Sequence, residues 1–169
     1  ALCGMVASLT TGKKKYADVE SEIQQLLKST NTLYDKLLDQ VRADAEGFQP
    51  LSRAYAIPRE DPTRAAVLQD AAETACTAPL EIMALCAAAL SAAGRLAEIG
   101  SRLAVSDAGC AAAILRGALE AAALNVLVNT KTMTDRSAAD HLNARCFALL
   151  DQGRTDGERI FCAVRDQLV

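Results

Sequence analysis

"YADVESEIQQLLKSTNTLYDKLLDQVRADAEGFQPL", residues 16–51, decides the fold, because its apolar side chains recur every three or four positions. That spacing is typical of the buried face of a long amphipathic helix. One carboxylate, Asp44, interrupts an otherwise apolar or threonine stripe. The stripe consists of Tyr16, Val19, Ile23, Leu26, Thr30, Leu33, Leu37, Val41, Asp44, Phe48 and Leu51.

Asp44 allows two interpretations. The stripe can drift at this point, so that Asp44 lies in solvent at its edge and Ala45 takes the core position. Alternatively, the helix holds the carboxylate in a poorly solvated cleft. A carboxylate removed from water binds its proton more tightly and becomes suited to proton transfer near neutral pH. The spacing alone does not decide between them.

The composition favours one all-α domain over residues 1–169. Hydrophobic residues make up 51% of the chain but aromatic residues only 4%, and much of the difference is alanine. Small apolar residues with few Gly and Pro predict closely packed helices. We expect a bundle of about five long, kinked helices. They cover residues 1–11, 16–48 or beyond with a kink or break at Pro50, 63–99 with a kink at Pro79, 108–131, and 137–168 with an interruption near "DQGRTDGER".

Short polar motifs predict where these helices begin and end. Gly12 is a typical helix stop. Asp61, either Ser106 or Asp107, and either Thr134 or Asp135 are candidate N-terminal caps. The chain opens on "ALCGMVASL" without a cap, so we expect that further residues precede this helix, although no signal peptide is recognisable.

Charge and cysteine usage exclude several classes of protein. A net charge of −3 argues against a nucleic-acid partner. The apolar stretches are interrupted by Glu81, Arg116 and Glu120, so no membrane span is expected. The six cysteines lie in apolar runs without metal-ligand spacing, which predicts buried, reduced thiols in a cytoplasmic protein. We find no metal, nucleotide or Ser-His-Asp motif and expect no cofactor.

The helices at 63–99 and 108–131 are apolar on more than one side. A single chain of this length leaves such faces uncovered, so a homodimer is predicted.

Further polar groups are candidates for binding, each with a structural alternative. Asn125 and Asn129, four residues apart, either tie helices together or contact a polar ring edge. Ser106 and Asp107 either cap a helix or line a site. Lys13 in "TGKKKY" and Arg59 in the 55–64 loop either form a solvated charged surface or bind an anionic tail.

Six motifs occur in the order found in the cyclodeaminase/cyclohydrolase family of folate enzymes, and the chain resembles that family over nearly its whole length. They are "MVASLTTGKKKY", "ADAEGF", "YAIPREDPTR", "APLEI", "SDAG" and "NVLVNTKTMTDR". Departures from the family pattern are Gly47, Arg59, Ser101, Pro50 and the absence of an upstream glycine-rich loop.

The resemblance implies an all-α, dimeric enzyme with its site in a cleft, Asp44 as the catalytic acid/base and a folate as substrate, which can carry several glutamates. The reaction favoured is hydrolysis of 5,10-methenyltetrahydrofolate to 10-formyltetrahydrofolate. The alternative is cyclodeamination of 5-formiminotetrahydrofolate, which releases ammonia. A third reading is an inactive, folate-binding or structural helical dimer.

Overall fold

A computed structural model describes residues 1–169, which form an all-α bundle. Two short 3-10 helices precede the long helices α2 and α5. The elements are α1 (Leu2–Thr10), η1 (Lys14–Val19), α2 (Glu20–Tyr55), α3 (Arg64–Ala75), α4 (Thr77–Ile99), η2 (Arg102–Ala104), α5 (Val105–Thr130) and α6 (Arg136–Leu168).

All five predicted helical segments are present, but the proline and glycine breaks are misplaced. α2 continues through Pro50 to Tyr55, so the helix does not end at Pro50 as the predicted break required. The third segment divides at Cys76, and Pro79 lies in the first turn of α4, where backbone N–H groups have no helical acceptor. α6 is uninterrupted through "DQGRTDGER", contrary to the prediction.

The predicted helix ends are correct in part. Gly12 follows α1 with φ +73°, a left-handed conformation that glycine adopts without strain. Asp135 caps α6, since its carboxylate accepts the Ala138 N–H at 3.0 Å. Ser106 and Asp107 are not caps, because α5 already begins at Val105.

Asp61 is not the helix cap either, since α3 begins only at Arg64. Its carboxylate accepts the Thr63 N–H at 2.8 Å in the preceding turn.

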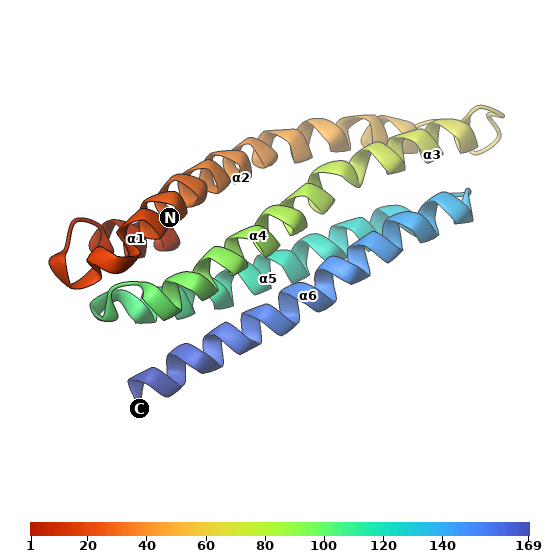
Figure 1. The fold of residues 1–169 in the computed structure, drawn as a ribbon. Coiled ribbons are helices and arrows are strands. Elements are labelled where there is room, and N and C mark those ends of the chain that lie inside the picture. Colours follow the sequence, from red (N-terminus) through yellow and green to blue (C-terminus); the bar gives the residue numbers. More distant parts are fainter.

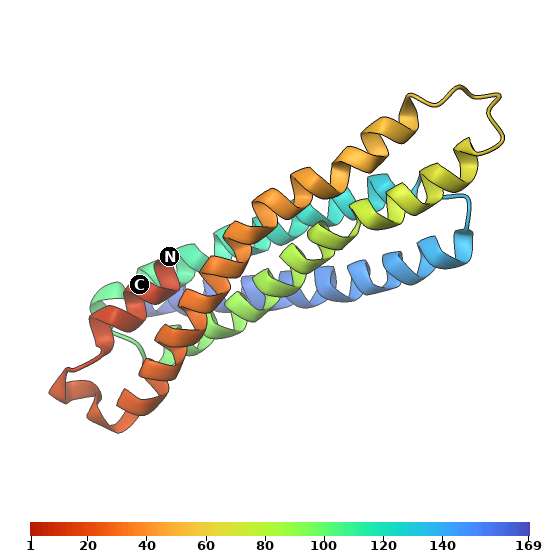
Figure 2. The ribbon, with the colours of Figure 1, turned by 90° about the horizontal axis from the view of Figure 1, so that it is seen from above.

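The long helices run roughly side by side, with α4 packed against α2, α5 and α6 (Figure 1). α1 covers one end, where it contacts α2, α4 and α5. The α2–α3 loop lies at the opposite end (Figure 2). Because α1 is only nine residues long, it covers α2 and α5 over part of their length.

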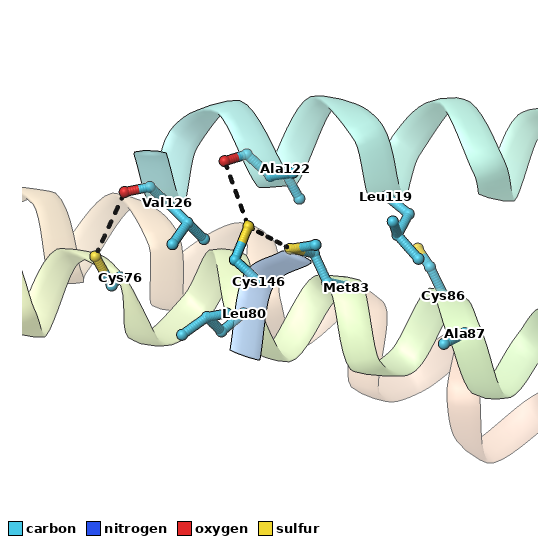
Figure 3. Close-up of a cluster of buried hydrophobic side chains, with 10 residues drawn as sticks. Cys76, Leu80, Met83, Cys86, Ala87, Leu119, Ala122, Val126 and Cys146 are labelled. Atoms are coloured by element: carbon cyan, nitrogen blue, oxygen red, sulfur yellow. Dashed lines mark hydrogen bonds between the residues drawn. The ribbon is translucent and has the colours of Figure 1, made fainter. Parts of the chain in front are cut away.

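The centre of the bundle is a sulfur-rich apolar cluster from α4, α5 and α6 (Figure 3). Cys146 Sγ lies 3.9 Å from Met83 Sδ and from the Ala123 carbonyl oxygen. Burial raises the pKa of the Cys76 thiol to about 11, so it stays protonated at neutral pH. The prediction of buried thiols is confirmed for Cys3, Cys76, Cys86 and Cys146, whereas Cys110 is exposed and Cys162 half-buried.

Two segments, 64–99 and 102–130, are long and apolar enough to cross a membrane by length and composition alone. The sequence argument that such stretches are too short or too interrupted is therefore wrong. In the first segment 67% of the most apolar window is buried in the bundle, as expected of a core helix. In the second only 33% is buried, which leaves an apolar face of α5 uncovered.

Candidate functional site

Asp44 lies in the second half of α2 and is exposed in this chain. The residues that face inward here are Gln40, Ala43 and Gly47, all half-buried, while Ala45 is exposed. Of the two interpretations of Asp44, the poorly solvated cleft is therefore not formed by the single chain. The solvated edge is the correct interpretation for the single chain, although Ala45 does not take the core position.

The change of neighbours along α2 explains this error. In the first half of α2, Ile23 packs in a cluster with Val6 of α1 and Ala93 of α4. In the second half, Leu51 and Ala54 pack against the alanines of α3. The buried side rotates around the helix between the two, so a stripe drawn straight through both halves leaves the core near Val41.

Two asparagines of α5 lie near the same level of the bundle as Asp44. Asn129 is buried, and its Nδ2 donates to the Ala75 carbonyl oxygen at 3.0 Å. A Cβ built on Gly47, one turn after Asp44, would lie 3.7 Å from the carbonyl oxygen of Thr74, the residue before Ala75. α2 and α5 therefore approach the α3–α4 junction from both sides, with Asp44 and Asn125 each about one turn before the contact.

The two asparagines have different surroundings. Asn129 has the helix-tying hydrogen bond that the structural interpretation predicted. Asn125 is exposed and has no hydrogen-bond partner in the chain, so it does not tie helices together. Its amide is free to contact a ligand.

Lys13, Ser106 and Asp107 lie at the other end of the bundle. There the "TGKKKY" and "GSRLAVSD" segments meet, because the Tyr16 hydroxyl accepts the Arg102 N–H at 3.2 Å. This hydrogen bond lowers the pKa of Tyr16; desolvation opposes the shift in part, and smaller contributions from Ser101 and nearby lysines add to the lowering. From Glu20 to Asp44 the chain rises about 36 Å along the helix axis. Lys13 therefore does not share a site with Asp44 within one chain.

Arg59 lies in the exposed loop beyond the C-terminal end of α2. The loop is ordered by its own contacts, since Arg64 Nε donates to the Ile57 carbonyl oxygen at 2.8 Å. Tyr55, where α2 ends, is about 16 Å along the axis from Asp44. Of the two predicted tail-binding cations, Arg59 is thus on the same half of the bundle as Asp44.

An apolar cavity of about 260 Å³ lies between α1, α2, α4 and α5. Leu33, Tyr34 and Leu37 line it from α2, and Ile114 and Leu115 from α5. Asp44 lies two helical turns beyond Leu37, so the cavity ends before it reaches the carboxylate. Leu33 and Leu37 were predicted only as core positions of the stripe, because apolar side chains at helical spacing carry no signal that separates a cavity wall from a core.

No group of three or more His, Cys, Asp or Glu side chains is arranged to hold a metal ion. This half of the bundle carries an exposed carboxylate on α2 and a free amide on α5, and the apolar cavity between the two helices ends before it reaches them. Such a set can bind a polar-edged aromatic ring and accept or return a proton.

The family model described as formiminotransferase-cyclodeaminase matches residues 1–148. The methenyltetrahydrofolate cyclohydrolase of Methylorubrum extorquens is 36% identical over 172 residues, which cover 99% of this chain and 83% of that protein. The formimidoyltransferase-cyclodeaminase of Sus scrofa is 30% identical over 92% of this chain, which spans only 29% of that protein.

The crystal structure of formiminotetrahydrofolate cyclodeaminase from Thermotoga maritima superposes with a TM-score of 0.90. The match covers 99% of this chain and 82% of that one, at 24% identity. At this identity the likeness concerns the fold.

Proposed function

The chain belongs to the formiminotransferase-cyclodeaminase family, and on that premise we propose that it hydrolyses 5,10-methenyltetrahydrofolate to 10-formyltetrahydrofolate. The observation that carries the proposal is the 36% identity to a methenyltetrahydrofolate cyclohydrolase, which spans 99% of this chain and 83% of the relative. By contrast, the chain spans less than a third of the bifunctional mammalian relative.

In the proposed mechanism, Asp44 moves one proton. As a water oxygen bonds to the cationic methenyl carbon between N5 and N10, the Asp44 carboxylate accepts a proton from that water. The protonated Asp44 then delivers it to N5 as the bond between carbon and N5 breaks. The remaining hydroxyl proton leaves to solvent as the formyl C=O forms. The negative charge of Asp44 also favours binding of the cationic substrate.

The neighbouring groups supply orientation. Asn125, exposed and free of partners, can hydrogen-bond the polar edge of the pterin, and Arg59 can bind the glutamate tail. A fixed orientation converts the addition of water into a step with a lower entropic barrier. We propose that the reaction needs neither a metal ion nor a nucleotide.

Cyclodeamination of 5-formiminotetrahydrofolate is the second candidate. The family model and the Sus scrofa relative carry cyclodeaminase names. In that reaction N10 attacks the formimino carbon and an acid helps ammonia to leave, so the same carboxylate serves either reaction. Asp44 therefore does not distinguish the two functions, and the substrate must be tested directly.

The test follows the methenyl absorbance with wild type, Asp44→Asn and the control Asp39→Asn. Asp39 is also exposed and lies on a different side of α2. With 5,10-methenyltetrahydrofolate, we expect wild type and Asp39→Asn to remove the band faster than unaided hydrolysis, with or without EDTA. Because Asp44→Asn removes the proton acceptor but keeps the shape, its kcat should fall ~10²- to 10⁴-fold.

Each other outcome has a defined meaning. Appearance of the band and release of ammonia from 5-formiminotetrahydrofolate, without hydrolysis of the methenyl compound, would identify a cyclodeaminase. No turnover of either folate would leave a folate-binding or structural protein. Near-wild-type activity of Asp44→Asn would remove Asp44 from the chemistry, and loss in EDTA that zinc restores would establish a metal requirement.

We also propose that the enzyme acts as a homodimer in the cytoplasm. The uncovered apolar face of α5 supports a second copy. The free cysteines fit a reducing compartment.

A further inference from the structure

Two exposed apolar side chains of α2 flank Asp44. Val41, three residues before it, is 71% exposed, and Phe48, four residues after it, is 53% exposed. Residues three and four apart are neighbours on a helix surface, with Cβ atoms about 5–6 Å apart. The carboxylate therefore lies in solvent between two apolar side chains of its own helix.

Phe48 has no part in the packing of the chain. It belongs to none of the four apolar clusters of the bundle. The preceding residue, Gly47, faces the α3–α4 junction instead, since a Cβ built on it would lie 3.7 Å from the Thr74 carbonyl oxygen. Helical side chains lean towards the N-terminus of their helix, so the Phe48 ring covers the turn that contains Asp44. The ring is thus available to a ligand of that carboxylate.

The other aromatic residues are less suited to such a ligand. Tyr16 lies at the opposite end of the bundle, and Tyr55 is about 16 Å along the helix axis from Asp44. Tyr34 lines the apolar cavity, which ends before it reaches the carboxylate. The chain has no Trp, and its other two phenylalanines belong to α6, which packs against α4 and α5. Phe48 is therefore the aromatic residue placed to share a ligand with Asp44.

An aromatic ring has a specific use beside this carboxylate. The faces of the ring carry partial negative charge and attract a cation within about 6 Å of the ring centroid. The substrate of the proposed reaction is such a cation, because the methenyl carbon shares one positive charge with N5 and N10. The product, 10-formyltetrahydrofolate, has no charge at this position. A ring here therefore discriminates between the two folates.

We infer, on the premise of the proposed function, that Phe48 is a substrate-binding residue whose ring face holds the cationic methenyl group next to Asp44. Both side chains belong to successive turns of one helix, so the helix itself fixes their relative position. Asp44 supplies charge and accepts the proton of the attacking water. The ring adds attraction for a flat, delocalised cation without competing for that proton.

The ring should act on binding rather than on the rate of the chemical step. The positive charge disappears as the water oxygen bonds to the methenyl carbon. The ring therefore stabilises the bound substrate more than the transition state. An interaction of this kind lowers KM without raising kcat. Phe48 and Asp44, although adjacent on the helix, should thus have separate kinetic effects.

The test compares Phe48→Leu, which keeps an apolar side chain but removes the ring, with Phe48→Tyr, which keeps the ring. For Phe48→Leu, the KM for 5,10-methenyltetrahydrofolate should rise about 2- to 30-fold, the range for a cation on an exposed to a dry ring face, with no fall in kcat. The Ki of 10-formyltetrahydrofolate should change by less than about twofold, because this inhibitor lacks the cation. Phe48→Tyr should keep the wild-type KM.

The matched control is Phe147→Leu on α6, a phenylalanine of similar exposure at 48%, which should change neither constant. Mass by light scattering and helicity by circular dichroism are measured for every variant, so that a change of assembly or fold is recognised. If Phe48→Leu alters either of them, Phe48→Met, which also lacks a ring, takes its place.

Three results would overturn the inference. An unchanged KM in Phe48→Leu would show that the ring does not contact the substrate. Equal increases in the KM of the cation and the Ki of the neutral folate would reduce Phe48 to an ordinary apolar contact, as would a Phe48→Tyr variant as weak as Phe48→Leu. A fall in kcat at constant KM would place the residue in the chemical step instead.

The outcome for Phe48 is separable from that for the proposed function, because binding of the methenyl compound can be measured by rapid ultrafiltration. A wild type that binds this cation more tightly than Phe48→Leu does, yet does not hydrolyse it, would refute the function alone. An active enzyme whose KM ignores Phe48→Leu would refute the inference alone. A wild type that neither binds nor hydrolyses the cation would refute both.

Discussion

α4 and α5 are similar in composition but not in surroundings. Both belong to segments that are long and strongly apolar, yet 67% of the most apolar window is buried for the segment containing α4 and only 33% for that containing α5. α4 packs against α2, α5 and α6, whereas α5 lies at the surface with α6 and α4 on one side. The amino-acid composition of a helix thus predicts how much of its surface is apolar. It does not predict whether that surface is buried within the chain or by another molecule.

The same contrast exists within α5. Leu119 points inward and is fully buried in the central cluster, whereas Leu124, five residues later, is 68% exposed on the outer face of α5. Asn129 points inward and Asn125 outward in the same way. Each pair keeps the residue type and the helix constant. A difference between its two members therefore separates the contribution of the buried face of α5 to stability from the role of its outer face.

The leucines should give the largest difference in the free energy of unfolding. Leu119→Ala removes a fully buried side chain and should cost ~2–5 kcal/mol. Leu124→Ala should change the stability of the single chain by no more than ~0.5 kcal/mol. Urea unfolding at a dilution that dissociates the proposed dimer measures both. Equal costs for the two leucines would mean that the outer face of α5 is packed within the chain.

The asparagines should separate stability from activity. Asn129→Ala leaves the Ala75 carbonyl oxygen without its donor and should cost ~1–3 kcal/mol, with kcat/KM per folded molecule retained. Asn125→Ala should leave the free energy of unfolding nearly unchanged and lower kcat/KM about two- to tenfold, the value of one hydrogen bond to substrate. Thermal unfolding and initial rates with the methenyl substrate check the pair. The reverse assignment would place the ligand contact on Asn129.

Sequence patterns predicted the helices well because helix formation is local. The periodicity in α2, the glycine at position 12 and the cap at Asp135 each depend on neighbours within a turn or two. The predicted break at Pro50 is wrong because packing against α3 stabilises the helix despite one missing hydrogen bond. The break at Cys76 carried no signal, since Pro79 fits the first turn of a helix as well as a kink.

The site was less predictable, because it depends on which helices meet. Asp44 interrupts the stripe drawn from the sequence, but the spacing alone did not predict its exposure, since the buried side of α2 changes where α3 replaces α1 as neighbour. The grouping of Lys13 with Arg59 assumed a proximity that a helix of 36 residues prevents within one chain. Pattern reasoning identifies polar residues suited to chemistry, whereas their grouping follows from tertiary packing.

The last comparison concerns two glycines on opposite sides of α5: Gly153 of α6, which packs on its buried side, and Gly117, which lies on its outer side. A Cβ on Gly153 of α6 would collide with the methyl groups of Leu119, so Gly153→Ala should cost ~1–3 kcal/mol through overpacking. A Cβ on Gly117 would meet open space, and alanine has the higher helix propensity. Gly117→Ala should therefore stabilise the single chain by ~0.5–1 kcal/mol.

The comparison sharpens when Gly117→Ala is made in the dimer. A methyl group at Gly117 takes space on the uncovered face of α5, where the proposed second copy would pack. Stabilisation measured at a dilution that dissociates the proposed dimer should thus be reduced or reversed at micromolar concentration. Equal stabilisation at both concentrations would show that nothing packs over Gly117, and that the outer face of α5 stays open in solution.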